Sequence, residues 1–350
     1  MAGRPAVGLD IGTSGVRAAE LSFGKGGHTL ERFGQIGLPS GAVRDGEVVD
    51  VDAVAAALRM LWAQAKFGTK KVVVGVANQK VVVRQVELPW LPADELRKSL
   101  PFQVQDYIPM PVDQAILDFH PLEESTNENG ARTVRVLLVA ASRDMVGSAV
   151  EAVEKAGLVP STVDLTSFAV LRSLAGEDAG LGLEAEALVD VGASITNIVV
   201  HQGGVPRFVR ILLMGGADIT DAVSERLGIP MDQAEHLKQV TGLDDSSDPH
   251  PVHRVLDLSG SAFVEEVRGS LDYYAAQPGS TRIGRVLLSG GGSLLRGLPQ
   301  RLSSATRLPV VAAQPMSRLR LGRTGLSDEQ LAYVAPLATV PLGLALREAS

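Results

Sequence analysis

The sequence predicts an α/β fold made of two related halves that close on one nucleotide. The first observation is a short phrase that occurs twice, at residues 7–14 and at residues 188–194. In each copy an apolar run leads to an aspartate, an apolar residue, a glycine and small residues, and a second apolar run follows. This pattern is typical of two strands joined by a tight turn whose backbone N–H groups can contact a phosphate. The second observation is a glycine-rich turn at residues 290–293, between an apolar strand and a helix.

The composition indicates a folded globular protein of about two domains. The chain has 350 residues, 45% of them hydrophobic, and its mean hydropathy is +0.15. It contains no cysteine, which excludes disulfides, a thiol nucleophile and cysteine-ligated metals. A net charge of -7 argues against a nucleic-acid-binding surface. No apolar run approaches the ~20 residues that span a bilayer. The chain also enters a predicted strand almost at once, so we expect no signal peptide and a cytoplasmic protein.

Apolar spacing predicts the elements of the first half and of an inserted domain. In the first half we expect one helix, at residues 52–65, with Asp50 or Asp52 as its N-cap. Strands are expected at residues 6–12, 15–23, about 29–38 and 71–77. A strand that ends at Pro89 then opens a small α+β insert. Its strands are expected at residues 81–88, 114–122 and 133–141, and its helices at 93–107 and 144–156.

The second half is predicted to repeat the hairpin and to add more helices. A helix at residues 166–174 and a loop at 176–182 lead into it. Its hairpin is expected to span residues 187–200 and 205–213, and a further strand is expected at 283–289. Its helices are expected at about 217–227, 231–240, 259–275, 294–302 and 330–347, with a polar loop at 244–253. Pro336 and Pro341 should bend or break the last helix.

Asp10 and Asp190 occupy the same place in the two repeated phrases. An aspartate at a strand end beside phosphates can hold Mg²⁺ through water, and a second one can orient an attacking water. The alternative is a turn aspartate that only accepts backbone N–H bonds. Two matched copies favour the functional interpretation, so both are candidate catalytic residues and Asp10 is a candidate Mg²⁺ ligand through water.

Two further motifs can contact a nucleotide. Glu235 and Lys238 are three residues apart and share a helix face, so they form either a clamp over a ribose or base or a surface ion pair. Gly290, Gly291 and Gly292 open a helix, where backbone N–H groups can bind a nucleotide, although a glycine turn is often only a turn. No Gly-Lys-Thr/Ser sequence follows, so this is not a Walker loop.

The motifs follow one another as hairpin, insert, second hairpin, Glu-x-x-Lys helix and Gly-Gly-Gly turn. Within the insert, Val-Glu-Leu-Pro at residues 86–89 precedes Gln-Asp-Tyr-Ile-Pro-Met-Pro at 105–111. In this order the chain resembles the actin, DnaK and hexokinase superfamily. In the insert it resembles, more narrowly, the PilM family of type IV pilus assembly proteins. The resemblance covers nearly the whole chain.

The resemblance implies an actin-like ATPase (ribonuclease H-like) fold. An inserted SHS2-type subdomain, 1C, would interrupt the first half, and a small subdomain, 2B, would interrupt the second. The implied division assigns residues 1–84 and 161–183 to 1A, 85–160 to 1C, 184–216 and 282–334 to 2A, 217–281 to 2B, and 335–350 to a C-terminal helix that packs on 1A.

The family also implies that ATP and Mg²⁺ bind between the halves. The residues that the resemblance assigns to ATP are Gly12, Thr13, Ser14, Arg17, Gly192, Ala193, Ser194, Glu235, Lys238, Gly290, Gly291 and Gly292. Arg17 stands where actin has a lysine, and Ala193 stands where actin has a second aspartate. We find no counterpart of actin's catalytic glutamine before the helix at 166–174. We therefore expect nucleotide binding with at most slow ATP hydrolysis.

The implied role is that of a scaffold beneath the inner membrane. PilM-like proteins bind the N-terminal tail of a PilN-like inner-membrane protein between 1A and 1C, and an extended peptide with apolar anchors suits such a groove. Phe102, Tyr107 and Ile108 are candidates for lining it or, alternatively, core residues of 1C. Other pilus platform proteins and motor ATPases are further expected partners, and a homo-oligomer is possible. We expect no nucleic-acid binding and no direct membrane insertion.

Two alternatives remain at this point. A cell-division protein like FtsA shares the fold but ends in an amphipathic membrane-binding helix, whereas residues 344–350 lack basic residues beside a strong apolar face. A small-molecule kinase of the same fold needs a catalytic carboxylate that faces an acceptor pocket, and no such carboxylate can be assigned.

Overall fold

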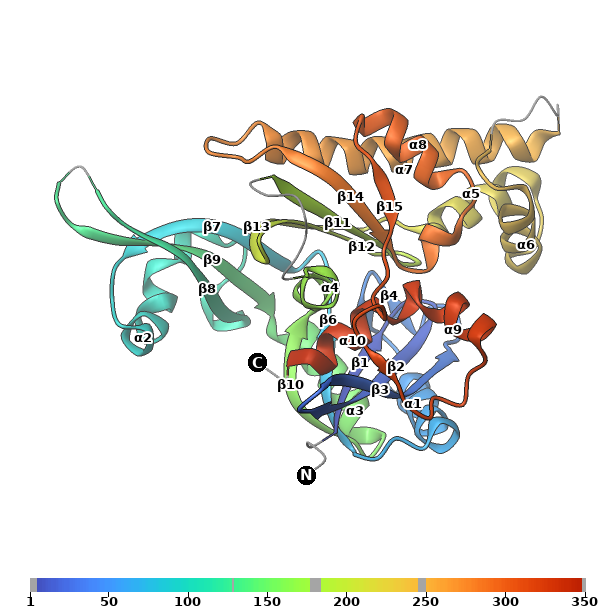
Figure 1. Ribbon diagram of the computed structural model, residues 1–350, viewed down its shortest axis with the longest axis horizontal. Helices are drawn as coiled ribbons and strands as arrows, with labels where there is room; N and C mark the ends of the chain where they lie inside the picture. Colours follow the sequence, from blue (N-terminus) through green and yellow to red (C-terminus); the bar gives the residue numbers. More distant parts are fainter. Residues whose placement is uncertain (1–4, 128, 177–183, 245–249, 348–350) are drawn as a thin grey trace.

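The computed structural model describes residues 5–127, 129–176, 184–244 and 250–347, and it contains two large sheets (Figure 1). The strands of the first, in spatial order, are β10 (Val159–Leu165), β6 (Lys71–Val76), β1 (Ala6–Ile11), β2 (Gly15–Gly24), β3 (Gly27–Gly37) and β16 (Arg320–Leu321). Those of the second are β15 (Val310–Ala312), β14 (Ile283–Ser289), β11 (Ala185–Val191), β12 (Thr196–Gln202) and β13 (Val205–Leu212). In both sheets three antiparallel strands are followed by two parallel ones. The two halves therefore share one topology.

Both predicted hairpins form, and their turns have the same geometry. Gly12 N donates to Gly15 O at 3.0 Å in the first turn, and Gly192 N donates to Ile195 O at 2.8 Å in the second. Asp10 lies opposite Arg17 across its hairpin, and Asp190 lies opposite Asn197. The repeated phrase thus places the two aspartates at equivalent positions.

Two helices fill the space between the large sheets (Figure 1). They are α4 (Thr166–Leu174) and α10 (Thr339–Leu346). A Cβ on Gly8 of β1 would lie 2.0 Å from Pro341 O, and a Cβ on Gly343 would lie 1.8 Å from Ala169 O. Because no side chain separates the backbones at these two points, α10 packs tightly against β1 on one side and α4 on the other.

Helices also cover the outer faces of both sheets. Val54, Leu58 and Leu61 of α1 (Val51–Ala65) share one core with Leu9 of β1, and α3 (Arg143–Lys155) contributes to the same core. Asp50 is the N-cap of α1 and accepts from Ala53 N at 2.9 Å. The second sheet is covered by α5 (Gly216–Leu227), α6 (Met231–Thr241), α7 (Pro251–Ala275) and α8 (Leu298–Thr306).

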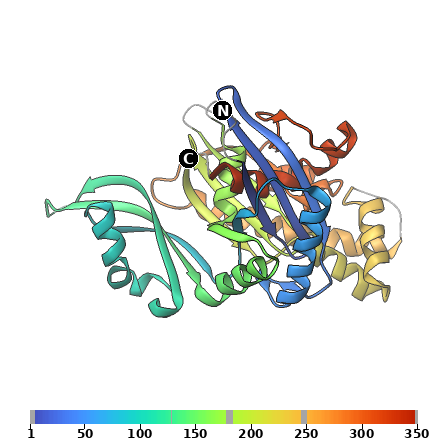
Figure 2. The same cartoon turned by 90° about the horizontal axis from the view of Figure 1, so that it is seen from below.

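The insert forms a third sheet that extends to one side of the two halves (Figure 2). Its order is β7 (Val81–Pro89), β9 (Arg132–Ser142) and β8 (Ala115–Thr126), and α2 (Ala93–Gln103) packs on it with a separate core. The side chains of α3 belong instead to the core of the first half. The predicted subdomain 85–160 thus includes a helix that packs elsewhere. Residues 177–183, which hold the predicted boundary between the halves and most of the predicted loop 176–182, lie outside the described residues.

Several predicted boundaries are wrong, for local reasons. The loop expected at 244–253 ends early, because α7 begins at Pro251. A proline at N1 has no N–H to satisfy, and His250 caps the helix by accepting from Val252 N. The helix expected at 93–107 ends at Gln103 and is followed by a short 3-10 turn. The helix expected at 294–302 begins only at Leu298, after a 3-10 turn over Gly291–Leu294.

The tail forms two helices rather than one. The first, α9 (Asp328–Val334), is separated from α10 by the 3-10 turn η4 (Pro336–Ala338). Pro336 marks the break as predicted, whereas Pro341 does not break α10, because it lies in the first turn, where backbone N–H groups need no intrahelical acceptor. Strands β10, β15 and β16 were not predicted.

Within the described residues, no single helix is long and apolar enough to cross a membrane. The bent pair Asp328–Val334 and Pro336–Leu346, at 54°, meets the criterion only by length and composition.

The substitution Gly343→Ala should lower the free energy of unfolding by about 3 kcal/mol, because the new methyl group would overlap the Ala169 carbonyl oxygen. Urea unfolding measures this. Gly147→Ala is the matched control, since Gly147 is an exposed helical glycine with nothing near its Cβ position, and it should raise the free energy by roughly 0.5–1 kcal/mol. Equal effects of the two changes would contradict the close packing of α10 on α4.

Candidate functional site

The two hairpin turns face a common cleft of about 530 Å³ between the halves. Asp10, Ser14 and Arg17 line it from the first half. From the second half it is lined by Asp190, Gly192, Ala193, Gly216, Ala217, Thr220, Met231, Asp232, Glu235, Lys238, Gly290, Gly291 and Gly292. A cleft of this size suits a nucleotide. Fourteen residues from separate motifs were predicted to bind a nucleotide or to act in catalysis, and eleven of them line this cleft. Gly12, Thr13 and Ser194 lie in the same turns but do not line the cleft.

The surroundings of Asp10 and Asp190 disfavour the charged carboxylate. Burial raises the pKa of Asp10, and Arg17 partly opposes this shift. Burial, together with the nearby charge of Asp10, raises the pKa of Asp190 to about 6. Hydrogen bonds from Ser289 and Asn197 oppose this shift. Both carboxylates would therefore gain from a cation between them.

Arg17 lines the cleft as a cation and keeps one N–H donor available for a ligand. Its Nη1 lies 3.8 Å from Asp10 Oδ2, and its Nη2 donates to Ser14 Oγ at 3.3 Å. Its Nε is buried without a hydrogen-bond partner among the described residues. A buried donor without an acceptor lowers the stability of the folded protein, and a phosphate oxygen would be an acceptor for it.

Glu235 and Lys238 form an ion pair that is also part of the cleft. Lys238 Nζ lies 2.7 Å from Glu235 Oε2, and it donates to Gly216 O at 2.8 Å and to Thr220 Oγ1 at 2.7 Å. Burial opposes the charge of Glu235, but hydrogen bonds from Lys238 and Thr220 hold its pKa below the usual range. All three Lys238 donors thus have partners in α5 and α6, and Lys238 forms an ion pair that is buried rather than on the surface, whereas Glu235 keeps a half-exposed carboxylate.

The glycine turn lies tightly between two neighbours. Gly290 has φ +83°, and a Cβ there would lie 2.3 Å from Val191 O. A Cβ on Gly292 would lie 2.4 Å from a Val191 methyl group, and one on Gly291 would lie 2.9 Å from Leu337. Glycine is therefore required by packing and by backbone conformation, in addition to any contact with a ligand.

An apolar pocket of about 250 Å³ adjoins the cleft beyond this turn. Ile219, Phe263, Leu295 and Leu298 line it, with Glu235 at its edge. Its size and lining suit the planar base of a nucleotide whose phosphates lie in the cleft.

Sequence reasoning missed several residues of the cleft. Gln35 of β3, Thr220 of α5 and Asp232 of α6 line it, as do Tyr333 and Leu337 near the C-terminal end. Thr220 follows Gly216 by four residues and therefore lies on the same helix face, a spacing that could have indicated a shared surface. Gln35 and Tyr333 belong to no motif, and only the fold brings them here. Among the described residues no group of three or more histidines and carboxylates could hold a metal.

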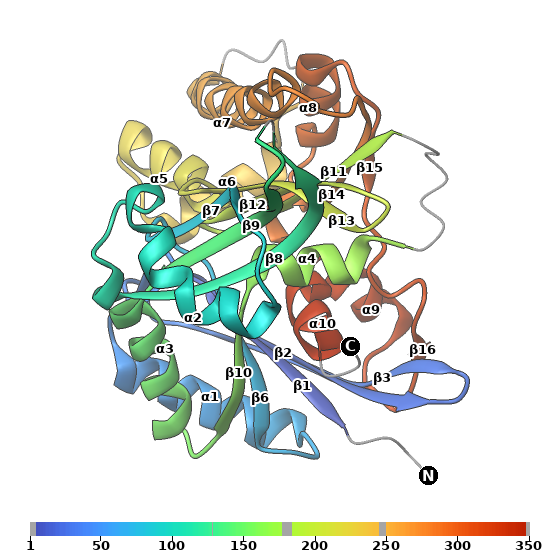
Figure 3. The ribbon, with the colours of Figure 1, turned by 90° about the vertical axis from the view of Figure 1, so that its left-hand side faces the viewer.

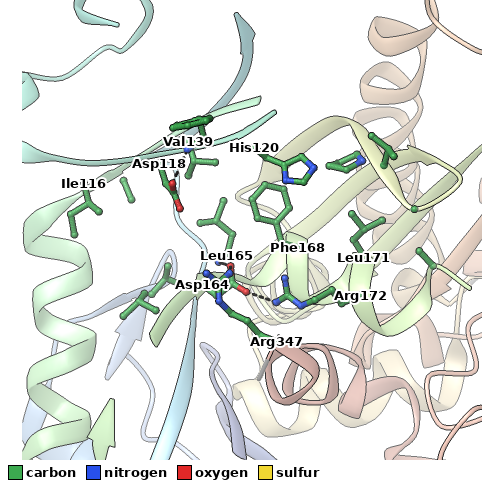
Figure 4. A pocket seen from close by; sticks show the side chains of 18 of the residues that line it. Ile116, Asp118, His120, Val139, Asp164, Leu165, Phe168, Leu171, Arg172 and Arg347 are labelled. Carbon is green, nitrogen blue, oxygen red and sulfur yellow. Dashed lines mark hydrogen bonds and ion pairs between the residues drawn. The ribbon is translucent and has the colours of Figure 1, made fainter. Parts of the chain in front are cut away.

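A second and larger hollow, of about 940 Å³, lies between the first half, the insert and the turn from β12 to β13. We call it the large groove. Figure 3 shows the insert sheet beside α4, and Figure 4 shows the side chains that line the groove. Ile116 and His120 of β8 form one wall, Phe168 and Leu171 of α4 a second, and the glycines of the β12–β13 turn a third.

One buried carboxylate anchors the floor of the large groove. Asp164 forms ion pairs with Arg172 and with Arg347, the latter at 3.1 Å (Figure 4). Arg172 Nε also donates to Gly343 O at 3.0 Å, which ties the floor to α10. Burial lowers the pKa of Arg172 while Asp164 opposes this shift, so the arginine is held as a paired cation.

The three residues predicted to bind a partner peptide do not line the large groove. Ile108 is buried in the insert core, as the alternative interpretation held. Phe102 is 79% exposed and lines a separate shallow pocket with Met110 and Pro111, while Tyr107 is partly exposed.

Comparison with protein families gives one match over nearly the whole chain. The model described as "Type IV pilus assembly protein PilM" matches residues 8–349. A solved structure described as a PilM–PilN type IV pilus biogenesis complex superposes with a TM-score of 0.87 at 28% identity, covering 99% of this chain and 98% of that one.

More distant relatives share the fold. The cell division protein FtsA of Neisseria meningitidis is 26% identical over 91% of this chain and 85% of its own length. FtsA of Bacillus subtilis is 25% identical over 67% of this chain, and the match spans only 58% of that protein. MreB5 of Spiroplasma citri, solved with AMPPNP, has a TM-score of 0.53 at 14% identity, over 99% of this chain and 96% of that one. The chain has an actin-like ATPase fold of mixed α/β sheets.

Replacement of Asp190 by asparagine should stabilise the protein at neutral and alkaline pH. The pKa of Asp190 is raised on folding, so its charge costs stability above pH 6, and the cost disappears below about pH 4, where the carboxyl is protonated in both states. We expect Asp190→Asn to raise the free energy of unfolding by on the order of 2 kcal/mol at pH 8 and by little at pH 4. Urea unfolding across this range measures it.

The same change at Asp221, an exposed residue of α5, is the control and should shift the free energy by less than about 0.5 kcal/mol at either pH. A pH-independent or destabilising effect of Asp190→Asn would show that the carboxylate does not carry a disfavoured charge.

Proposed function

The chain belongs to the PilM family of type IV pilus assembly proteins, and on that premise we propose that it is an ATP-binding scaffold that holds the tail of a PilN-like inner-membrane protein. The observation that carries the proposal is the presence of two separate sites, a cleft between two matched hairpin turns and a groove between the first half and the insert. In this role the protein would be cytoplasmic and peripheral to the inner membrane through its partner. It would also contact other platform proteins and motor ATPases, and self-association remains part of the proposal.

The proposed nucleotide site places phosphates between the two turns. Gly12, Thr13, Ser14 and Arg17 would approach them from one side and Gly192, Ala193 and Ser194 from the other, with the orphan Arg17 Nε as one donor. Glu235 would face the ribose, and the base would enter the apolar pocket beside Gly290, Gly291 and Gly292. When bound, Mg²⁺ would neutralise the phosphates, with Asp10 holding its water ligands.

The charge of the cleft makes Mg²⁺ a requirement of this proposal. Four carboxylates line the cleft, against two cations. One of those cations, Lys238, already has three oxygen partners. Free ATP would be repelled, whereas the magnesium complex would bring a cation to Asp10 and Asp190. Ala193 and the absence of a counterpart of actin's glutamine support binding with at most slow hydrolysis.

Calorimetric titration should therefore detect binding of Mg-ATP and at least about tenfold weaker binding of ATP in EDTA. Asp10→Asn should weaken Mg-ATP binding by about tenfold, because it removes the charge that faces the magnesium waters. Asp221→Asn should bind like the unchanged protein. If ATP binds equally well with and without Mg²⁺, the proposed arrangement of the cleft is wrong.

The large groove is the proposed site of the partner tail. Its walls are mainly apolar, and Ile116 of the edge strand β8 is 38% exposed at its mouth. An extended peptide could lie along β8, with apolar side chains reaching Phe168 and Leu171. We therefore place the tail here rather than on the surface around Phe102.

Fluorescence anisotropy with the N-terminal tail peptide of the PilN-like protein from the same organism tests this. Ile116→Asp should weaken binding by at least about tenfold, because it places a charge in an apolar wall. Phe102→Asp should leave binding within about twofold of the unchanged protein. The reverse pattern would place the tail on the surface of α2 around Phe102, one of the residues predicted to line the groove.

No binding of the tail peptide by a folded protein that still binds Mg-ATP would favour a role closer to the FtsA relatives or to a small-molecule kinase. Turnover measured with candidate acceptors would then separate these two.

A further inference from the structure

The cleft and the apolar pocket are connected, because they share lining residues from two parts of the chain. Glu235, Gly291 and Gly292 of the second half line both hollows. So do Tyr333 of α9 and Leu337 of η4. A ligand that extends from one hollow into the other must pass these two side chains.

The segment that carries Tyr333 is anchored on the first half. Its neighbours Val334 and Ala338 are buried in a core with Leu21, Leu30 and Phe33 of the first sheet. The start of α9 is fixed by a capping box, in which Ser327 and Gln330 exchange hydrogen bonds between side chain and backbone. The position of Tyr333 is therefore set by the first half, although its ring lines pockets of the second.

The same segment is fastened to the glycine turn. Gly290 N donates to Pro336 O at 3.1 Å, and a Cβ on Gly291 would lie 2.9 Å from Leu337. Tyr333 thus stands at a fixed place beside the turn against which the proposed nucleoside would lie. Yet its side chain is 60% exposed, unlike Val334 next to it, which is buried. A large aromatic ring at the mouth of an apolar pocket offers a flat face to a ligand.

We propose that Tyr333 positions the nucleoside, with its ring stacked on the purine base as the base enters the apolar pocket. Aromatic side chains bind bases through their π-faces without reading hydrogen bonds. This inference rests on the proposed nucleotide site and adds a contact from the first half to a base otherwise held by the second. The base would then join the two halves, as the phosphates do between the hairpin turns.

The test measures affinity for Mg-ATP by calorimetry in the full-length protein with three substitutions. Tyr333→Leu keeps an apolar side chain without a π-face and should weaken binding by about tenfold. Tyr333→Phe keeps the ring and should bind within about twofold of the unchanged protein. Tyr273→Leu, which removes an equally exposed tyrosine of α7 outside the cleft, is the control and should have no effect.

Rescue by phenylalanine but not by leucine would support stacking. Equal weakening in Tyr333→Leu and Tyr333→Phe would assign the effect to the hydroxyl or to a packing change and overturn the inference. So would unchanged binding in Tyr333→Leu while Asp10→Asn still weakens it. Failure of the unchanged protein to bind Mg-ATP would instead overturn the proposed nucleotide site, and this inference with it.

Discussion

The packing of α10 between β1 and α4 is the contact on which both candidate sites depend. The two sheets do not touch directly around this point, since the helix pair fills the space between them. Gly8 and Gly343 allow backbone contact on either side of α10, and no larger residue fits at either place. The cleft opens where the hairpin turns of the two sheets approach one another, and the large groove lies along α4. The helix pair therefore lies next to both sites, with α4 forming a wall of the groove and α10 contributing Val340 to the cleft.

Helix α4 connects the two sites through buried polar contacts. Thr166 Oγ1 and Ser167 Oγ, at its first turn, donate to Asn197 Oδ1 at 2.9 and 2.8 Å. Asn197 in turn hydrogen-bonds Asp190 in the cleft. On the other side of the same helix, Phe168 lines the large groove. A buried network of this kind is strong only while every member keeps its partner, and it joins Asp190 of the cleft to the first turn of the helix that forms the groove wall.

The features that could be predicted from the sequence are those that occur twice in it or that depend on a short run of residues. The matched hairpins, the paired aspartates and the glycine turn could be found because each depends on a few adjacent residues. Helix ends were harder where a proline serves as N1, as at Pro251, because the same residue also signals a loop. A groove between the first half and the insert was implied only by the family resemblance. Its lining could not be predicted, since Ile116, Phe168 and the β12–β13 turn are far apart in the chain and meet only through the fold. Phe102 was a reasonable candidate by residue type, but exposure alone does not place an aromatic side chain in a groove.

The raised pKa values in the cleft connect stability with binding. Burial raises the pKa of both Asp10 and Asp190, and the charge of Asp10 adds to the shift of Asp190, so the surroundings favour the neutral forms. Ser289 and Asn197 reduce this cost for Asp190 but leave its pKa raised. An amide at one of these positions would remove the unfavourable charge and still offer one acceptor oxygen. Both carboxylates instead occupy equivalent strand ends, where a cation and a phosphate chain between the turns would relieve the cost. The unfavourable charge is thus a reason to expect a ligand, independent of any family resemblance, and the gain on binding includes the relief of that charge.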